Sequence, residues 1–61
     1  MIKINTTYVH YKNNESYITI DFCKIQENDS WVEAIIYKPI DCEELFVRSS
    51  KEFEEKFSIK K

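Results

Sequence analysis

The only histidine of the chain, His10, stands in a row of side chains suited to binding an anion. Tyr8 and Lys12 lie two residues to either side of it, so all three side chains would leave the same face of a β-strand. Such a row combines an aromatic ring with two donors, which suits a phosphate and a ring attached to it. Arg48 can hold the same kind of anion through two parallel hydrogen bonds. With two further tyrosines, these residues form the predicted ligand-binding set: Tyr8, His10, Lys12, Tyr17, Tyr37 and Arg48.

The polar members of this set also have structural interpretations. The ring of His10 could instead pack at a subunit or helix contact, and the lysine of the row could lie on a solvated strand face. Arg48 could form an ion pair with a nearby carboxylate, for which the candidates are Glu33, Glu44 and Glu52.

A second group of residues predicts a surface for binding another protein. Aromatic side chains exposed on a sheet often mark such surfaces. Here they have acidic neighbours at Glu33, Glu43 and Glu44. The residues that would form this surface are Trp31, Glu33, Tyr37 and Phe46.

Enzyme signatures are missing from the sequence. There is no P-loop, no glycine-rich phosphate turn, no nucleophile elbow and no His–Glu–His metal spacing. Zinc needs about four ligands, and His10, Cys23 and Cys42 form no recognisable motif within one chain. The sequence does not exclude a catalytic Cys–His dyad, but a chain this short rarely builds the deep cleft that such a dyad needs. We therefore expect no enzyme activity, no cofactor and no metal.

The start of the chain lacks the basic segment and apolar run of a secretory signal. No apolar stretch approaches the ~20 residues of a membrane span. We expect a cytoplasmic protein with no membrane partner, whose two cysteines stay reduced.

The chain has 61 residues and a formal charge of −2, so residues 1–61 form a single domain. A chain this small has a marginal core, and this favours a homo-oligomer. The acidic balance argues against nucleic acid as a partner, because binding to its backbone relies on Lys and Arg. A hydrophobic content of 43% is too high for a disordered chain.

The chain contains no glycine, so Asn and Asp must supply the turns that need positive φ. Between these turns, apolar and polar residues alternate with the period of two that is typical of strands. This pattern predicts four strands, preceded by a short one and followed by a frayed tail at 58–61. The predicted strands are 7–12, 16–26, 31–39 and 44–48, with the short one at 2–4.

The pattern changes near the C-terminus. Ser49 and Glu52 fit a capping box, and Phe53 and Phe57 recur four residues apart, which predicts an amphipathic helix over 50–57 with both rings in the core. The expected fold is mainly β: a small SH3-like barrel, or a strongly bent antiparallel sheet of four to five strands, with one short C-terminal helix.

The order of several short motifs resembles a small domain of unknown function found in bacteria and their phages. That family reads Y-x-H-[FY]-K-G, then V-V-Y, L-W-V-R-P and M-F-x-E. The matching segments here, spread over about residues 8–55, are Tyr8-Val9-His10-Tyr11-Lys12, Ile36-Tyr37, Leu45-Phe46-Val47-Arg48 and Phe53-Glu54-Glu55.

The sequence departs from the family pattern at several positions. Asn13 replaces Gly, Phe46 replaces Trp and Ser49 replaces Pro. The H-S-E-T-like segment of the family is not kept in this sequence, and only its glutamate has a counterpart, Glu27. The resemblance implies a compact β domain with a recurrent polar set, an unknown biochemical role and a phage origin. It thereby places the protein in the host cytoplasm.

Two main functions follow from these observations. The favoured one is a non-enzymatic binding module, phage-encoded, that holds a small anionic, nucleotide-like ligand at the Tyr/His/Lys/Arg cluster and sequesters a host signal. The alternative is a phage or bacterial inhibitor of a host defence or regulatory protein that binds through the aromatic and acidic surface. A third possibility, an SH3-like or OB-like nucleic-acid-binding barrel, is opposed by the net charge.

Overall fold

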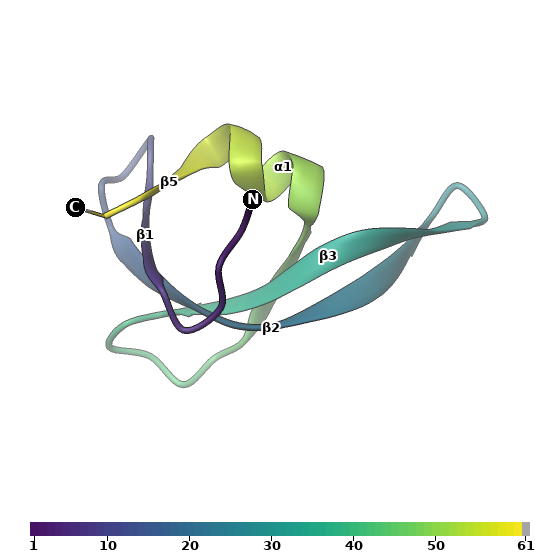
Figure 1. The fold of residues 1–61 in the computed structure, drawn as a ribbon. Helices are drawn as coiled ribbons and strands as arrows, with labels where there is room; N and C mark the ends of the chain where they lie inside the picture. Colours follow the sequence, from purple (N-terminus) through teal and green to yellow (C-terminus); the bar gives the residue numbers. More distant parts are fainter. Residues whose placement is uncertain (61) are drawn as a thin grey trace.

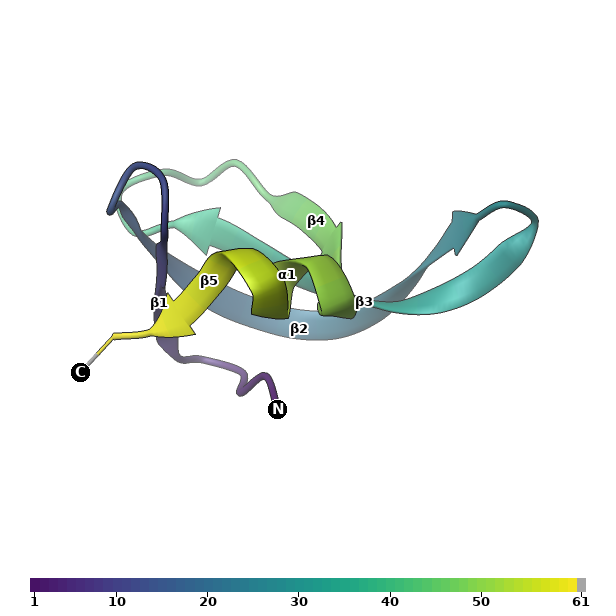
Figure 2. The same ribbon diagram turned by 90° about the horizontal axis from the view of Figure 1, so that it is seen from above.

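The computed structural model describes residues 1–60 and consists of one antiparallel sheet with a short helix on one face (Figures 1 and 2). The strand order is β4-β3-β2-β1-β5. The elements are β1 (Thr7–His10), β2 (Ser16–Glu27), β3 (Ser30–Pro39), β4 (Phe46–Ser49), α1 (Ser50–Lys56) and β5 (Phe57–Ile59). The mainly β fold is confirmed, in its bent-sheet form, because the described strands do not close into a barrel.

The glycine-free turns use asparagine and aspartate, as expected from the sequence. Asn5, Asn14, Asn28 and Asp29 all have positive φ. Asn28 (φ 48°) and Asp29 (φ 64°) join β2 to β3 in a two-residue loop. Two consecutive positive φ values match the tight hairpin turn whose twist fits that of the flanking strands.

A bulge in β2 changes which residues face the helix. Thr19 of β2 pairs with Tyr37 of β3. The next residue of β3 in the ladder, Ile36, pairs with Asp21, so Ile20 is an extra residue without a partner. Strict alternation along residues 16–26 predicts that Ile18, Ile20 and Phe22 share a face. That prediction is wrong for Phe22, because the extra residue places it on the face opposite to that of Ile18.

We call the face of the sheet that packs against α1 the inner face. Its core is mostly aromatic, and Phe53 and Phe57 stack within it with ring centroids 4.2 Å apart. Phe53 and Ile35 are fully buried. The prediction that Phe53 and Phe57 are core residues is confirmed. The remaining buried members of the cluster are Ile2, Tyr8, Tyr17 and Tyr37.

The helix begins at the serine that the capping box predicts, while the Glu52 carboxylate pairs with Arg48. The side chain of Ser49 accepts a hydrogen bond from the Glu52 backbone N–H at 3.2 Å, which satisfies one of the unpaired donors of the first turn. The tail does not fray at once, contrary to expectation. Phe57–Ile59 forms β5 and pairs with β1, where Phe57 lies opposite His10.

The predicted strand at 2–4 is absent from the described chain, and a buried hydroxyl holds this segment instead. The Thr19 side chain donates to the Lys3 carbonyl at 2.6 Å and accepts from the Thr6 backbone N–H at 3.1 Å. The fourth predicted strand is also shorter than expected, because β4 begins at Phe46 rather than at residue 44.

Candidate functional site

The ring of Phe57 is the centre of a cluster built from all five strands. The ring of His10 on β1 meets the Phe57 ring edge-on, with the two ring centroids 4.8 Å apart. The guanidinium of Arg48 on β4 lies over the Phe57 ring, 5.8 Å from its centroid. Tyr17 on β2 and Tyr37 on β3 also contact it edge-on, at 5.4 and 5.2 Å. We call these five residues the Phe57 cluster. It brings together four of the six residues that the sequence predicted as ligand-binding.

Arg48 is held from two sides. Its Nε donates to the hydroxyl of Tyr37 at 2.8 Å, and its Nη1 forms an ion pair with Glu52, four residues along the chain. Burial lowers the pKa of Arg48, but the bonds to Tyr37 and Glu52 outweigh that effect, so its pKa is raised above the ordinary value. Of the three glutamates considered as partners, Glu52 is the one that pairs. The guanidinium therefore stays charged and fixed in orientation.

His10 is 9% exposed, and its environment disfavours a positive charge. Its Nδ1 accepts a hydrogen bond from the Lys12 backbone N–H at 3.1 Å, so the neutral ring carries its proton on Nε2. Burial lowers the pKa of His10 below 6.5, and the positive charges of Arg48, Lys56 and Lys12 lower it further. His10 is thus a neutral ring at pH 7 with three cations around it.

The expected row of Tyr8, His10 and Lys12 on one strand is only half correct. Tyr8 and His10 share the inner face, but β1 ends at His10, so Lys12 lies in the following turn. Lys12 reaches His10 through its backbone instead. The strand is shorter than predicted because the chain turns through Asn14, whose N–H donates to the carbonyl of His10 at 2.9 Å.

The three tyrosines of the predicted set bury their rings and expose no face on which a ligand could stack. Tyr8, Tyr17 and Tyr37 are 4–8% exposed. Each hydroxyl accepts one bond, from the Lys3 backbone N–H, Asn13 Nδ2 and Arg48 Nε respectively. All three lie on the inner face of the sheet, where Tyr8 pairs with Tyr17. The alternation pattern alone does not say which face lies inward.

Sequence reasoning missed two residues at the edge of this cluster. Tyr11 is 60% exposed, and its ring stacks on His10 at 5.3 Å with an interplanar angle of 20°. The Nζ of Lys56, at the end of α1, lies over the Tyr11 ring, 5.8 Å from its centroid. Tyr11 could have been found from its position next to His10. Lys56 could not, because only the docking of α1 on the sheet brings it there.

The predicted protein-binding residues do not form one surface. Trp31 is 67% exposed and Glu33 is exposed, whereas Tyr37 is buried and Phe46 is 37% exposed beside it. Trp31 and Glu33 lie near the tip of the β2–β3 hairpin, away from Phe46 on β4.

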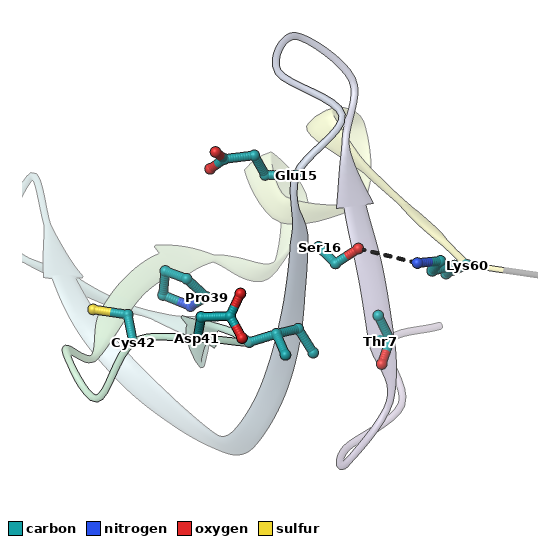
Figure 3. A pocket seen from close by; sticks show the side chains of 8 residues that line it. Thr7, Glu15, Ser16, Pro39, Asp41, Cys42 and Lys60 are labelled. Carbon is teal, nitrogen blue, oxygen red and sulfur yellow. Dashed lines mark hydrogen bonds between the residues drawn. The ribbon is translucent and has the colours of Figure 1, made fainter.

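A hollow of ≈ 580 Å³ lies away from the Phe57 cluster, between the start of β2 and the loop after β3 (Figure 3). Glu15, Asp41 and Cys42 line it, together with Lys60, whose Nζ lies 3.4 Å from the Ser16 hydroxyl. Nothing in the sequence pattern had indicated this hollow.

Two further searches of the described residues were negative. Residues 1–60 contain no group of three or more His, Cys, Asp or Glu side chains placed to hold a metal ion. Within the same residues, no helix has the length and apolarity to cross a membrane.

Comparison with known proteins identifies the family of the chain. The family model described as "Protein of unknown function (DUF1653)" matches residues 6–61, so the chain belongs to this family. No curated protein and no solved structure matches the chain.

Proposed function

We propose that this DUF1653 protein is a non-enzymatic binding module that holds a small anionic, nucleotide-like ligand beside the Phe57 cluster. The contacts would come from the cations around His10 and from the exposed ring of Tyr11. Stoichiometric binding of this kind would let the protein sequester a host signal, and a phage origin belongs to the same proposal.

The observation that carries the proposal is the concentration of positive charge around a neutral histidine. Arg48, Lys56 and Lys12 all lower the pKa of His10. Within residues 1–60, Arg48 is the only one of these three that forms a salt bridge. An anion bound among them would relieve their mutual repulsion in a chain whose net charge is −2.

The aromatic part of the proposal is shifted from the buried tyrosines to Tyr11. Its ring is already stacked on His10, and more than half of its surface is exposed. A planar ring bound next to it would gain stacking contacts without opening the core. This arrangement favours a ligand that combines an anionic group with a planar ring.

The test is a titration of the protein with inorganic phosphate and with AMP, followed through the NMR signals of His10. Binding of either anion near the three cations should raise the pKa of His10, because it offsets their charge. Lys56→Gln should weaken binding. Lys51→Gln, which removes a charge from the same helix but not from the His10 environment, should not. His10 signals that stay unmoved up to millimolar concentrations of both probes would refute the proposal.

The alternative, an inhibitor that binds a host defence or regulatory protein, is supported by the 67% exposure of Trp31. Large exposed aromatic side chains dominate the binding energy of many interfaces. In this case Trp31→Ser would abolish inhibition of the host protein, whereas His10→Gln would leave it intact. Under the first proposal, His10→Gln would abolish sequestration of the ligand, whereas Trp31→Ser would leave it intact.

A further inference from the structure

The outer part of the β2–β3 hairpin, residues 22–33, projects from the body of the molecule (Figures 1 and 2). We call it the arm. β1 pairs with β2 only through Ser16–Ile18, and β4 pairs with β3 only through 34–37. Within residues 1–60 the arm therefore has no third strand beside it, and α1 lies over the body rather than over the arm (Figure 2).

The arm carries apolar side chains on both faces. Phe22 and Trp31 lie on the inner face and are 51% and 67% exposed. Trp31 pairs with Gln26, and the pair of Lys24 and Glu33 lies between it and Phe22 on this face. Cys23, Ile25 and Val32 lie on the other face and are half-buried. A polar ribbon would not need covering, but this one leaves two large aromatic side chains in water.

An isolated two-stranded ribbon is at best marginally stable in water, and a third strand or an element packed against its face is needed to stabilise it. The surface of the molecule measures 4524 Å², slightly more than the about 4,200 Å² that a compact monomer of this size exposes. The arm accounts for the elongated shape, with extents of 34 × 22 × 19 Å.

We propose that the inner face of the arm packs against the same face of a second copy of this chain. An antiparallel, two-fold arrangement would bring Trp31 of each copy next to Phe22 of the other, because the two residues lie at opposite ends of one face. This inference does not rest on the ligand site.

The charge of this face favours a second copy as the occupant. Between the two aromatic residues stand Lys24 and Glu33, which are directly opposite each other in the strand pairing. The face is therefore neutral and offers both signs to an identical face, so self-association meets no net repulsion.

The available area is also sufficient. Trp31, Phe22 and the exposed polar side chains between them present on the order of 500 Å² per copy. Two copies would bury about 1,000 Å², which reaches the minimum for a biological interface and belongs to the weak, transient class. A dimer of micromolar affinity is the expected result.

Trp31 is the only tryptophan of the chain, so its fluorescence reports directly on this face. We expect emission to shift to shorter wavelength as the protein is concentrated through the micromolar range, in parallel with a monomer-to-dimer transition in sedimentation equilibrium. Phe22→Ser should weaken dimerisation at least about tenfold. Leu45→Ser, a change at a residue that is 58% exposed but lies off the arm, should leave it unchanged.

A charge exchange provides a test that does not touch the apolar residues. Glu33→Lys should weaken dimerisation by making the face positive, and the double variant Lys24→Glu, Glu33→Lys should restore it. A wild-type protein that stays monomeric at near-millimolar concentration would overturn the proposal and leave the arm for a different protein. A dimer that is insensitive to both Phe22→Ser and Glu33→Lys would overturn it as well.

Discussion

The bond between Arg48 and Tyr37 predicts a coupled loss of stability when either residue is changed. Arg48→Met removes a hydrogen bond from a charged donor to the buried Tyr37 hydroxyl, at 2.8 Å, which is worth ~1.5–3 kcal/mol. It also removes the contact with the Phe57 ring, worth ~0.5–1 kcal/mol. The exposed pair with Glu52 adds only ~0.3–0.5 kcal/mol because solvent screens it.

These contributions are not fully additive, so the expected cost of Arg48→Met is about 2–3 kcal/mol. A domain of this length is stable by only roughly 3–9 kcal/mol, so the loss is a large fraction of the total. Tyr37→Phe should cost about 1 kcal/mol, because it leaves the Arg48 Nε without its partner.

The measurement is urea unfolding followed by far-UV circular dichroism. With a slope near 1 kcal/mol/M for a chain this short, Arg48→Met should lower the midpoint by about 2–3 M. The double variant Arg48→Met, Tyr37→Phe should be about 1 kcal/mol more stable than the sum of the single effects predicts. Lys51→Met, which removes an exposed cation from α1, should stay within about 0.5 kcal/mol of the wild type.

A coupling energy below about 0.3 kcal/mol would show that Arg48 and Tyr37 act independently, and the description of the Phe57 cluster as a connected unit would then be wrong. The same result decides how ligand experiments are designed. Because Arg48→Met is expected to destabilise the fold, Lys56→Gln is the cleaner variant for testing anion binding.

Three further predictions concern the elements around the cluster. Thr19→Val should cost ~1–3 kcal/mol in urea unfolding, because the Lys3 carbonyl and the Thr6 N–H lose their buried partner. The pKa of His10, measured by NMR titration, should lie below 6.5. The folded state therefore binds the proton less readily than the unfolded chain. The free energy of unfolding should be highest above pH 6.5, fall as the pH drops from 6.5 to the folded pKa, and level off below it. A flat profile that matches that of His10→Gln would contradict this. Asn14, at φ 57°, should tolerate Gly with a change of at most about 1 kcal/mol, whereas Ala should lower stability by about 1 kcal/mol.

Local signals predicted the turns and the helix start correctly because each depends on only a few adjacent residues. In a chain without glycine, the pair Asn28 and Asp29 is the natural choice for two successive positive φ values. Ser49 caps the helix because its side chain needs only the N–H of Glu52, three residues on. Neither feature needs information from the rest of the fold.

The orientation of the strands could not be predicted in the same way. Alternation in β2 and β3 places apolar residues on both faces, and the bulge at Ile20 then exchanges the faces halfway along β2. The aliphatic residues Ile18 and Ile36 point away from the helix, while Tyr17 and Tyr37 fill the core. A pattern of alternating residues contains no signal for such a bulge, because the extra residue is a feature of the pairing between β2 and β3 and not of either strand alone.

The Phe57 ring shows why the candidate site and the fold are hard to separate from sequence alone. Phe57 ends the helix and begins a strand, and its ring packs on Phe53, His10 and Tyr17 while Arg48 lies over it. Residues chosen for their chemistry, such as His10 and Arg48, therefore also carry part of the packing. The groups left for a ligand are those whose polar ends remain outside this packing, above all Lys56 and the ring of Tyr11. Lys56 is positioned by the docking of α1, and the backbone N–H of Tyr11 donates to the Lys56 carbonyl at 3.0 Å. Binding at this site should therefore be lost whenever the packing of α1 on the sheet is loosened, even if every cation is still present.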